Sequence, residues 1–477
     1  MIRRILSAIA LLVLLLSIPA TRLGSRIQYR EKFDLSCTGC NVVLLNIDLL
    51  RADFLGLLNK KKGSTPNIDL FFKNAIVFED VSSSSGVTAI SNAATLTARH
   101  GDFTYGLLQR TYVDKPPQMP HMFRDLYSKI PTILETFHAV GYETININHG
   151  WYSGKQMLLD RGVDFYWGSG EVGATDNNPA RVINKTAEVI KDRSDSSSPF
   201  ILLMRSEDMR GLPYRYPVNR PHLEDPRVKY RRRAEENYDI YFQPLIDGTL
   251  SKDHPSSAKV GWMSDTQIEE YRQLSYALYR QQLKFVDEKL GRLFEVIEKS
   301  ALLENTIVIL YSNHGDGLYD NRVPNHGVSY QSCVSVPLII RHPKIKLPVR
   351  VRESIALIDL GPTIHEMLSI KSTKKLDGIS VVNIIRGIEA YPNKYLYGSD
   401  KESKYIRRGR YKLIVWANRS KELYDLKEDP GERNNLARQR PSLVRELYKY
   451  LVLHEVEQLQ RVLSLLRSER LSTDRIE

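Results

Sequence analysis

The sequence has few cysteines, no internal repeat and no long low-complexity segment. Its 3 cysteines among 477 residues are too few for a disulfide scaffold. Hydrophobic residues make up 42% and charged residues 26%, ordinary globular values that exclude disorder over most of the length. No nucleic-acid-binding motif is present and the positive charge is dispersed, so we expect no nucleic-acid partner. The net charge of +12 still favours an anionic partner, such as an acidic lipid or an anionic substrate.

One apolar run stands apart from the rest of the chain. Arg3 and Arg4 precede residues 5–20, ILSAIALLVLLLSIPA. This run is long for the core of a signal peptide and slightly shorter than the ~20 residues that span a bilayer. We therefore expect residues 1–25 to be either a cleaved signal peptide or an uncleaved membrane anchor. In both cases the remaining chain would be extracytoplasmic, either secreted or membrane-anchored.

The cysteines fit this compartment. Cys37 and Cys40 form a single CxxC motif, and no second CxxC is present to complete a metal site. We expect these two residues to pair or to remain structural. Cys333 is left single and is expected to be buried.

Short apolar runs alternate with helical patterns from Asn41 onward, which is typical of an α/β fold with a mainly parallel sheet flanked by helices. Buried strands are expected at residues 41–48, 76–79, 144–148, 200–204, 306–311 and 336–341. Helices are expected at residues 130–140, 180–192 and 266–299.

The chain divides into a large domain, a small subdomain and a terminal helix. The α/β domain is expected at 36–372, interrupted by a 209–263 insertion at the end of the sheet where substrate loops usually lie. Short strand patterns predict a small C-terminal α+β subdomain at 373–440. Residues 441–477 are expected to form an amphipathic helix that packs on the protein, with membrane or partner contact as the alternative. The leucines that mark this pattern are Leu443, Leu447, Leu451, Leu459, Leu463 and Leu466.

Polar residues gather where three of these segments end or begin. Asp48 closes the first strand pattern, and SNHGDG at 312–317 follows the strand expected at 306–311, with His326 shortly after. Thr88 lies in a polar loop that becomes helical, where it could cap the helix or act as a nucleophile. Since the carboxyl ends of parallel strands meet at one sheet edge, these residues together predict one site.

Seven motifs resemble, in the same order, those of the sulfatase family of the alkaline-phosphatase superfamily. They span roughly residues 40–440 and read NIDLLRADFLG, the Thr88 loop ending LTAR, SNHGDG, NHGVSYQSCVSVPLII, ALIDLGPTI, LDGISVVNIIRG and ELYDLKEDPGERNNLA. The resemblance implies a large α/β domain with a mainly parallel sheet and a small C-terminal subdomain. It also implies an enzyme that acts on an anionic ester.

The resemblance assigns roles to seven residues. Four would hold one divalent metal ion, either calcium or manganese or zinc: Asp48, Thr88, Asn313 and His314. Three would contact the substrate anion: His149, Arg210 and His326. The catalytic residues would be Thr88, as nucleophile, and His326.

The sequence departs from the family at two of these positions. Typical sulfatases convert a Cys or Ser, followed by Pro two residues later and Arg four residues later, to formylglycine. Here the corresponding residues are Thr88, Ile90 and Asn92, so no formylglycine is expected. Asn313 replaces a carboxylate and would weaken a divalent ion, although an amide oxygen remains a competent ligand.

We therefore expect a metal-dependent hydrolase or phosphotransferase that acts on a sulfate or phosphate ester through a covalent intermediate on Thr88. The substrate would be a sulfated or phosphorylated glycan or lipid. Threonine favours phosphoryl-type chemistry over sulfate hydrolysis, as in the threonine-nucleophile phosphoethanolamine transferases that this site resembles. The alternative is a non-catalytic, anion-binding pseudoenzyme on the same scaffold.

Overall fold

The structure is a computed structural model. It describes residues 34–59, 65–101, 130–148, 160–168, 180–194, 196, 198–210, 263–371, 376–392, 395–400 and 402–473, with side chains up to 464. The expected signal or anchor at 1–25, His149 and most of the 209–263 insertion lie outside the described residues.

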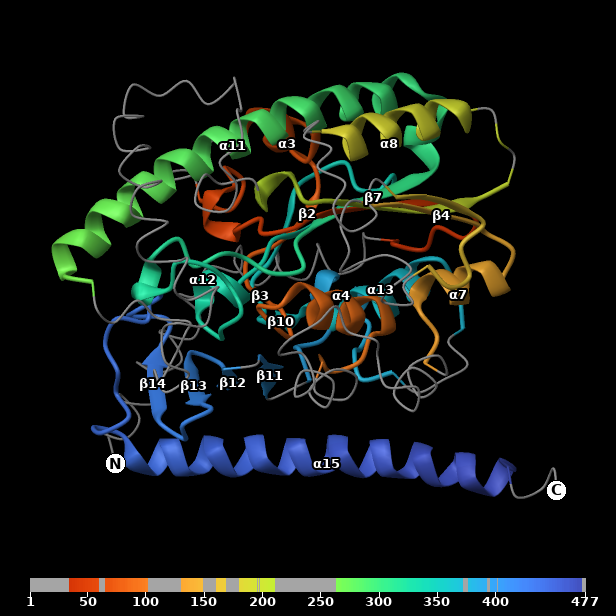
Figure 1. Ribbon diagram of the computed structural model, residues 1–477. Helices are drawn as coiled ribbons and strands as arrows, with labels where there is room; N and C mark the ends of the chain where they lie inside the picture. Colours follow the sequence, from red (N-terminus) through yellow and green to blue (C-terminus); the bar gives the residue numbers. More distant parts are fainter. Residues whose placement is uncertain are drawn as a thin grey trace, which may run out of the picture.

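An eight-stranded sheet forms the centre of the large domain (Figure 1). Its strand order is β5-β4-β6-β1-β7-β8-β2-β9. Only β8 runs antiparallel to its neighbours, β7 and β2. The strands are β1 Asn41–Ile47, β2 Ile76–Phe78, β4 Glu143–Asn148, β5 Phe165–Gly168, β6 Phe200–Ser206, β7 Thr306–Tyr311, β8 Leu338–Arg341 and β9 Val349–Val351. The predicted mainly parallel α/β fold is confirmed.

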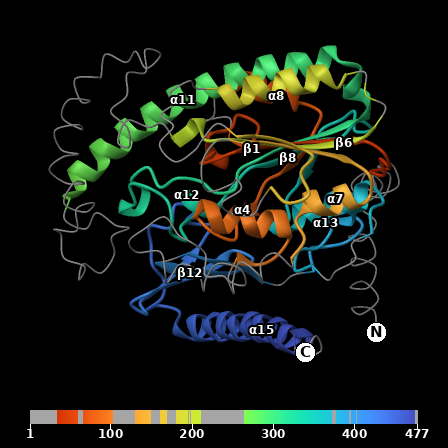
Figure 2. The same ribbon diagram turned by 45° about the vertical axis from the view of Figure 1, so that its right-hand side comes forward.

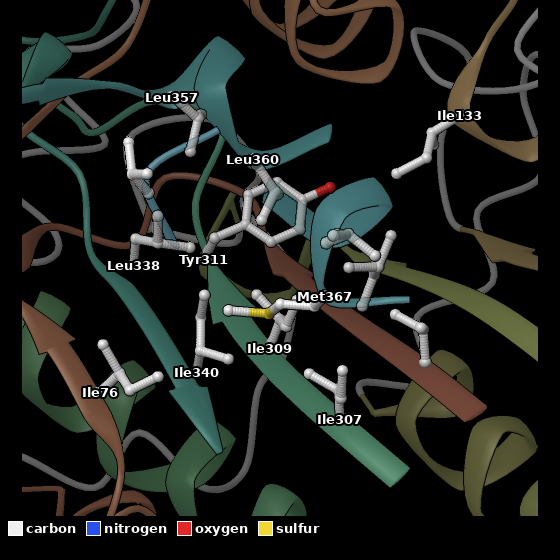
Figure 3. Packing of buried hydrophobic residues seen from close by; sticks show 14 of the residues in the cluster. Ile76, Ile133, Ile307, Ile309, Tyr311, Leu338, Ile340, Leu357, Leu360 and Met367 are labelled. Atoms are coloured by element: carbon white, nitrogen blue, oxygen red, sulfur yellow. The ribbon is translucent and has the colours of Figure 1, made fainter. Parts of the chain in front are cut away.

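Helices cover both faces of this sheet (Figures 1 and 2). One face carries α3 Pro66–Phe71, α8 Arg181–Asp192 and α11 Asp265–Lys299. The other carries α4 Thr88–Thr97, α7 Ile133–Ala139 and α13 Leu360–Met367. Since both faces are buried, β1 has a continuous apolar run, Val42–Leu45, whose side chains alternate between two cores. Figure 3 shows the α13 side of the sheet, where Ile309 and Tyr311 lie near Leu360 and Met367.

A second sheet follows the large domain. It is antiparallel, in the order β11 Leu396–Ser399, β12 Ser403–Arg408, β13 Tyr411–Trp416 and β14 Lys421–Asp425. The long helix α15, Pro441–Thr473, crosses beneath it (Figure 1). The remaining short elements are β3 Val81–Ser82, β10 Ile355–Ala356, α12 Gln331–Val334 and α14 Val382–Ile385.

Several element boundaries differ from the prediction for local reasons. The strand predicted from residue 336 begins after Pro337, which has no N–H for a ladder hydrogen bond. The helix predicted from residue 130 begins after Thr132, which forms a capping box with Glu135. The strand predicted to end at 204 continues to Ser206, because Arg205 is buried in spite of its charge.

The structure also tests the expectations for the cysteines and for the terminal helix. Cys37 and Cys40 are paired as a disulfide, and Cys333 is buried, as predicted. The helix expected at 441–477 is present as α15 and packs on the protein through Leu447 and Leu451, whereas Leu459 is 51% exposed. Among the described residues, no helix is both long and apolar enough to cross a membrane.

Candidate active site

The sheet register places a row of polar residues near the carboxyl ends of its strands. Asn148 of β4, Arg205 of β6, Asn46 of β1 and Tyr311 of β7 lie on neighbouring strands in register. Side chains alternate along a strand, so residues two positions further on point to the same face when the chain stays extended. Asp48, Glu207 and Asn313 occupy those following positions. The candidate site is therefore built at one edge of the sheet, where α/β proteins bind ligands.

Thr88 approaches this edge from helix α4. It is the first residue of the helix, and Val87 occupies the N-cap position. The Thr88 side chain is 3% exposed, and its hydroxyl contacts His314 rather than capping the helix. The capping interpretation of Thr88 is therefore wrong.

Asp48, Thr88 and His314 meet at one point. The Oγ1 of Thr88 lies 2.9 Å from the Nε2 of His314, which lies 3.4 Å from the Oδ1 of Asp48. The other ring nitrogen, Nδ1, lies 2.8 Å from the carbonyl oxygen of Gly315. A carbonyl only accepts hydrogen bonds, so Nδ1 donates and a neutral ring keeps its lone pair on Nε2. Nε2 can therefore accept a proton or bind a cation.

The residue before His314, Asn313, carries an unsatisfied amide. Its side chain is fully buried, and neither amide atom has a hydrogen-bond partner among the described residues. Only its backbone is engaged there, because its carbonyl oxygen accepts a hydrogen bond from the Ser83 hydroxyl at 2.5 Å. A buried polar group without a partner costs about 1–3 kcal/mol. The amide is thus placed for a ligand that the protein itself does not supply.

His326 closes the site toward solvent. Its ring stacks on that of His314, with centroids 4.6 Å apart, and its Nδ1 lies 3.5 Å from the Oδ1 of Asp316. Its side chain is 15% exposed, whereas the side chains of Asp48 and His314 are fully buried. His326 is therefore the residue of this group that an entering substrate can reach first.

Sequence reasoning missed Arg205. This residue is 1% exposed and donates from Nη2 to the Oδ2 of Asp48 at 3.0 Å and from Nη1 to the Oε1 of Glu207 at 2.8 Å. The available signal was an arginine directly after the apolar run FILLM of β6, at the edge where the site lies. Its guanidinium places a fixed positive charge beside the expected metal ligand.

Two expected substrate contacts remain predictions. Arg210 ends a 3-10 helix, Asp208–Arg210, that follows β6, and its side chain is not among those described. His149 is the residue after β4 and lies outside the described residues.

The donor atoms at this point suit one metal ion of reduced affinity. Among the described residues there is no cluster of three or more Asp, Glu, His or Cys that could hold a metal. The site offers instead one carboxylate, one imidazole, one amide and one hydroxyl. Ligands at right angles and ~2.1–2.4 Å from an ion are ~3.0–3.4 Å apart. The spacings of 2.9 and 3.4 Å around Nε2 of His314 agree with this, and the buried Asn313 amide adds a ligand, so these residues fit a cation.

Comparison with known proteins agrees with this fold and motif order. The profile of the family described as Sulfatase matches residues 40–370, and that of the N-sulphoglucosamine sulphohydrolase C-terminal region matches residues 315–460. The chain is 24% identical over 447 residues to an arylsulfatase of Clostridium perfringens, covering 83% of this chain and 90% of that protein. It is 23% identical to a Delta 4,5-hexuronate-2-O-sulfatase of Bacteroides thetaiotaomicron, covering 83% and 84%.

A solved structure described as a 2-O GAG sulfatase superposes with a TM-score of 0.64 at 20% identity, covering 90% of this chain and 94% of that chain. At this identity the superposition shows the shared fold. Because the first profile spans most of the sequence, the family assignment rests on the chain as a whole and not on a single motif. This protein belongs to the sulfatase family.

Proposed function

We propose that this chain is an extracytoplasmic hydrolase of sulfate esters that uses Thr88 as its nucleophile. The observation that carries the proposal is the 2.9 Å contact between the Thr88 hydroxyl and the Nε2 of His314, next to Asp48. A nucleophile within hydrogen-bond reach of a base, itself oriented by a third group, is the arrangement of covalent catalysis. Relatives named as arylsulfatases and as hexuronate and N-acetylglucosamine sulfatases support a sulfated glycan or aryl sulfate as the substrate class.

Thr88, His314 and His326 have separate roles in the proposed reaction. The Oγ1 of Thr88 attacks sulfur and forms a new S–O bond, while the bond from sulfur to the leaving oxygen breaks. Nε2 of His314 is placed to take the Thr88 proton, and His326 gives a proton to the leaving alkoxide. Water then attacks the sulfo-threonine, releasing sulfate and restoring Thr88. The Asp316 carboxylate, 3.5 Å from Nδ1, orients His326 and attracts its protonated form.

A divalent metal ion fits beside these groups. When bound by Asp48, Asn313 and His314, it would neutralise the non-bridging oxygens and replace His314 in promoting loss of the Thr88 proton. Arg205 keeps the second oxygen of Asp48 in place in either case. The chain thus supplies both an oriented carboxylate and a fixed positive charge.

Phosphoryl transfer is the second candidate. Thr88 is followed by Ile90 and Asn92 in place of the residues that direct formylglycine formation, and threonine cannot form that aldehyde. This departure favours phosphorus chemistry, whereas the names of the curated relatives favour sulfur. We give precedence to the sulfate ester because those relatives are matched over most of the chain.

The test is turnover of matched aryl sulfate and aryl phosphate esters by the full chain, with calcium, manganese or zinc and without metal. Thr88→Ala should lower turnover by roughly 10³-fold or more, and Thr88→Ser should keep part of it. An ester carrying labelled sulfur or phosphorus should transfer its label to the peptide that contains Thr88.

The matched control is Ser91→Ala, which removes another buried hydroxyl from α4 and should leave turnover unchanged. A sulfur label on Thr88 supports sulfate hydrolysis, and a phosphorus label alone supports the second candidate. Full activity of Thr88→Ala would refute the nucleophile. No turnover of any ester would favour the non-catalytic, anion-binding alternative.

The compartment is also part of the proposal. The apolar run at 5–20 and the Cys37–Cys40 disulfide both suit a chain that folds outside the cytoplasm. Fractionation of cells that express the full chain, with protease added outside, tests this. Complete protection from the protease in intact cells would contradict a surface or secreted location.

A further inference from the structure

Helix α15 has two apolar faces, and only one of them is used by the fold. The buried face consists of Leu447, Leu451, His454, Gln458 and Val462, which pack toward the second sheet. Figures 1 and 2 show the helix at the outer edge of the molecule, with that sheet on one side of it. The helix therefore also presents an outward face.

The outward face carries a continuous apolar stripe. It consists of Val452, Val456, Leu459 and Leu463, whose exposed fractions are 36%, 46%, 51% and 44%. Their spacing of four, three and four residues keeps them in line along the helix, and at ~100° per residue they lie about 130° from the buried face. This stripe, which we call the outer stripe, thus has no role in packing the described part of the protein.

The charges beside the outer stripe have one sign. Arg445 and Lys449 continue it toward the start of the helix, are exposed, and form no ion pair with any described residue. Lys421 adds a third cation, with its Nζ 4.5 Å from the Tyr448 ring.

The acidic residues of the helix whose side chains are described lie to the sides and are neutralised. Glu446, Glu455 and Glu457 pair with Arg408, Lys404 and Arg461. An apolar stripe flanked by cations and free of carboxylates is the pattern of a helix that lies in the plane of an anionic membrane surface.

The sequence before the described residues agrees with this partner. Residues 5–20 are apolar enough to enter a bilayer, and residues 21–33 separate them from Asp34, the first described residue. Thirteen extended residues reach at most about 45 Å. If residues 5–20 are retained as an anchor, the chain is tethered to a bilayer, and a second weak attachment through α15 would add to it to give stable binding.

We propose that the outer stripe of α15 docks on an anionic lipid surface and holds the catalytic domain flat against the membrane. The partner is the lipid bilayer itself. Acidic headgroups contact Arg445 and Lys449, and the acyl boundary accepts the four apolar side chains. This inference does not depend on the reaction proposed above.

Fluorescent labelling of the full chain on vesicles tests this docking. Cys37 and Cys40 are paired and Cys333 is fully buried, so an introduced surface cysteine can be labelled selectively. An environment-sensitive probe is placed on Val456→Cys in the stripe and, as the matched control, on Ser464→Cys, an exposed position on the flank of the helix. Vesicles contain phosphatidylcholine alone or with about 30% phosphatidylserine, since anionic lipid contributes about fivefold per nearby cation.

On phosphatidylserine vesicles, quenching of the Val456→Cys probe by acrylamide should fall several-fold, and that of the Ser464→Cys probe should change little. Added Leu459→Gln and Leu463→Gln should restore quenching, because both side chains are exposed and their loss leaves the fold intact. Equal quenching at the two positions on these vesicles would overturn the proposal. So would protection without vesicles that rises with protein concentration, which would identify a second copy of the chain as the partner.

Discussion

Two arginine–aspartate pairs differ in how the arginine meets the carboxylate. Arg407 of β12 donates from Nη1 and Nη2 to both carboxylate oxygens of Asp80, and also donates to Ser354 and to the carbonyl of Gly409. Arg205 donates from Nη2 to the Oδ2 of Asp48 and from Nη1 to the Oε1 of Glu207. The first pair forms a closed fork between the second sheet and the turn after β2. The second leaves Oδ1 of its carboxylate facing His314.

This difference distinguishes Arg407–Asp80, an ion pair that stabilises the fold, from Arg205–Asp48, an ion pair in the candidate active site. Burial alone would raise the pKa of Asp80, but Arg407 overcomes it and holds that pKa below the usual value. At Asp48 the neighbouring groups are a buried amide without a partner in the described protein and a threonine hydroxyl, which suit a ligand. The pairing of Arg with Asp is therefore not diagnostic, whereas an unsatisfied polar atom beside the pair is informative.

The largest expected effect is the loss of either arginine. Arg205→Met leaves the fully buried carboxylate of Asp48 without its cation, so it should lower the free energy of unfolding by about 3–5 kcal/mol in the absence of metal. Arg407→Met should cost less, about 2–3 kcal/mol, because the Asp80 side chain is 25% exposed. Urea denaturation of both variants in a chelator measures this. A loss below ~1 kcal/mol for Arg407→Met would show that its fork is dispensable.

A divalent metal should then distinguish the two variants. In Arg205→Met the ion can replace the missing charge at Asp48, so saturating calcium or manganese should restore about 2.7 kcal/mol when its concentration is 100 times the Kd. Arg407→Met keeps the Asp48 site with Arg205 still beside it, so at the same metal concentration it should recover less. Equal recovery in both variants would show that the ion does not replace the charge of Arg205, and recovery in neither would contradict a metal site at Asp48.

Asn313 should set how tightly the ion is held. Asn313→Asp adds a carboxylate to a buried donor set, so divalent-metal affinity measured by calorimetry should rise on the order of tenfold or more. Asn434→Asp, at an exposed position, adds the same charge outside the site and should leave the affinity unchanged. Unchanged affinity in Asn313→Asp would mean that this side chain does not face the ion.

The sequence predicted the elements whose signals are local. The apolar runs at 41–48 and 306–311 predicted β1 and β7 closely, because strands buried on both faces are continuous in hydrophobicity. It also predicted that Asp48 and Thr88 would meet near His314, since strand ends share one edge. The place of Arg205 directly after FILLM indicates the sheet edge, but its contact with Asp48 could not be predicted, because it depends on the register between β1 and β6, which is a long-range contact.

The two faces of α15 also depend on a long-range contact that the sequence does not predict. Leucine spacing predicts an amphipathic helix, but the side that packs is decided by the second sheet, so Leu451 is buried while Leu459 is exposed. The sequence also does not show whether a buried polar side chain finds all of its hydrogen-bond partners. Asn313 was recognised as a departure from a carboxylate, and only the structure shows that its amide lacks a partner among the described residues.

The smallest expected effect concerns His365. This residue tests whether a buried polar atom without a partner always indicates a ligand site. Its ring lies on α13, its two nitrogens are buried without a hydrogen-bond partner among the described residues, and burial lowers its pKa to about 4. It resembles Asn313 in being unsatisfied, yet its ring neighbour is Phe137, 5.9 Å away, which suggests no ligand. In the unfolded chain a histidine takes its proton near pH 6.5, so the folded protein should lose stability as pH falls from about 6.5 toward 4.

His365→Leu should reduce that loss by about 1–2 kcal/mol between pH 8 and pH 5, because a leucine binds no proton in either state. Urea denaturation of the wild type and the variant at the two pH values measures it. Met367→Leu, on the same helix, removes no titratable group and serves as the control, with the pH dependence of the wild type. If His365→Leu keeps the full pH dependence of the wild type, the ring of His365 is already protonated or hydrated in the folded protein. In that case the buried ring nitrogens of His365 would indicate a bound ligand or water as strongly as the amide of Asn313 does.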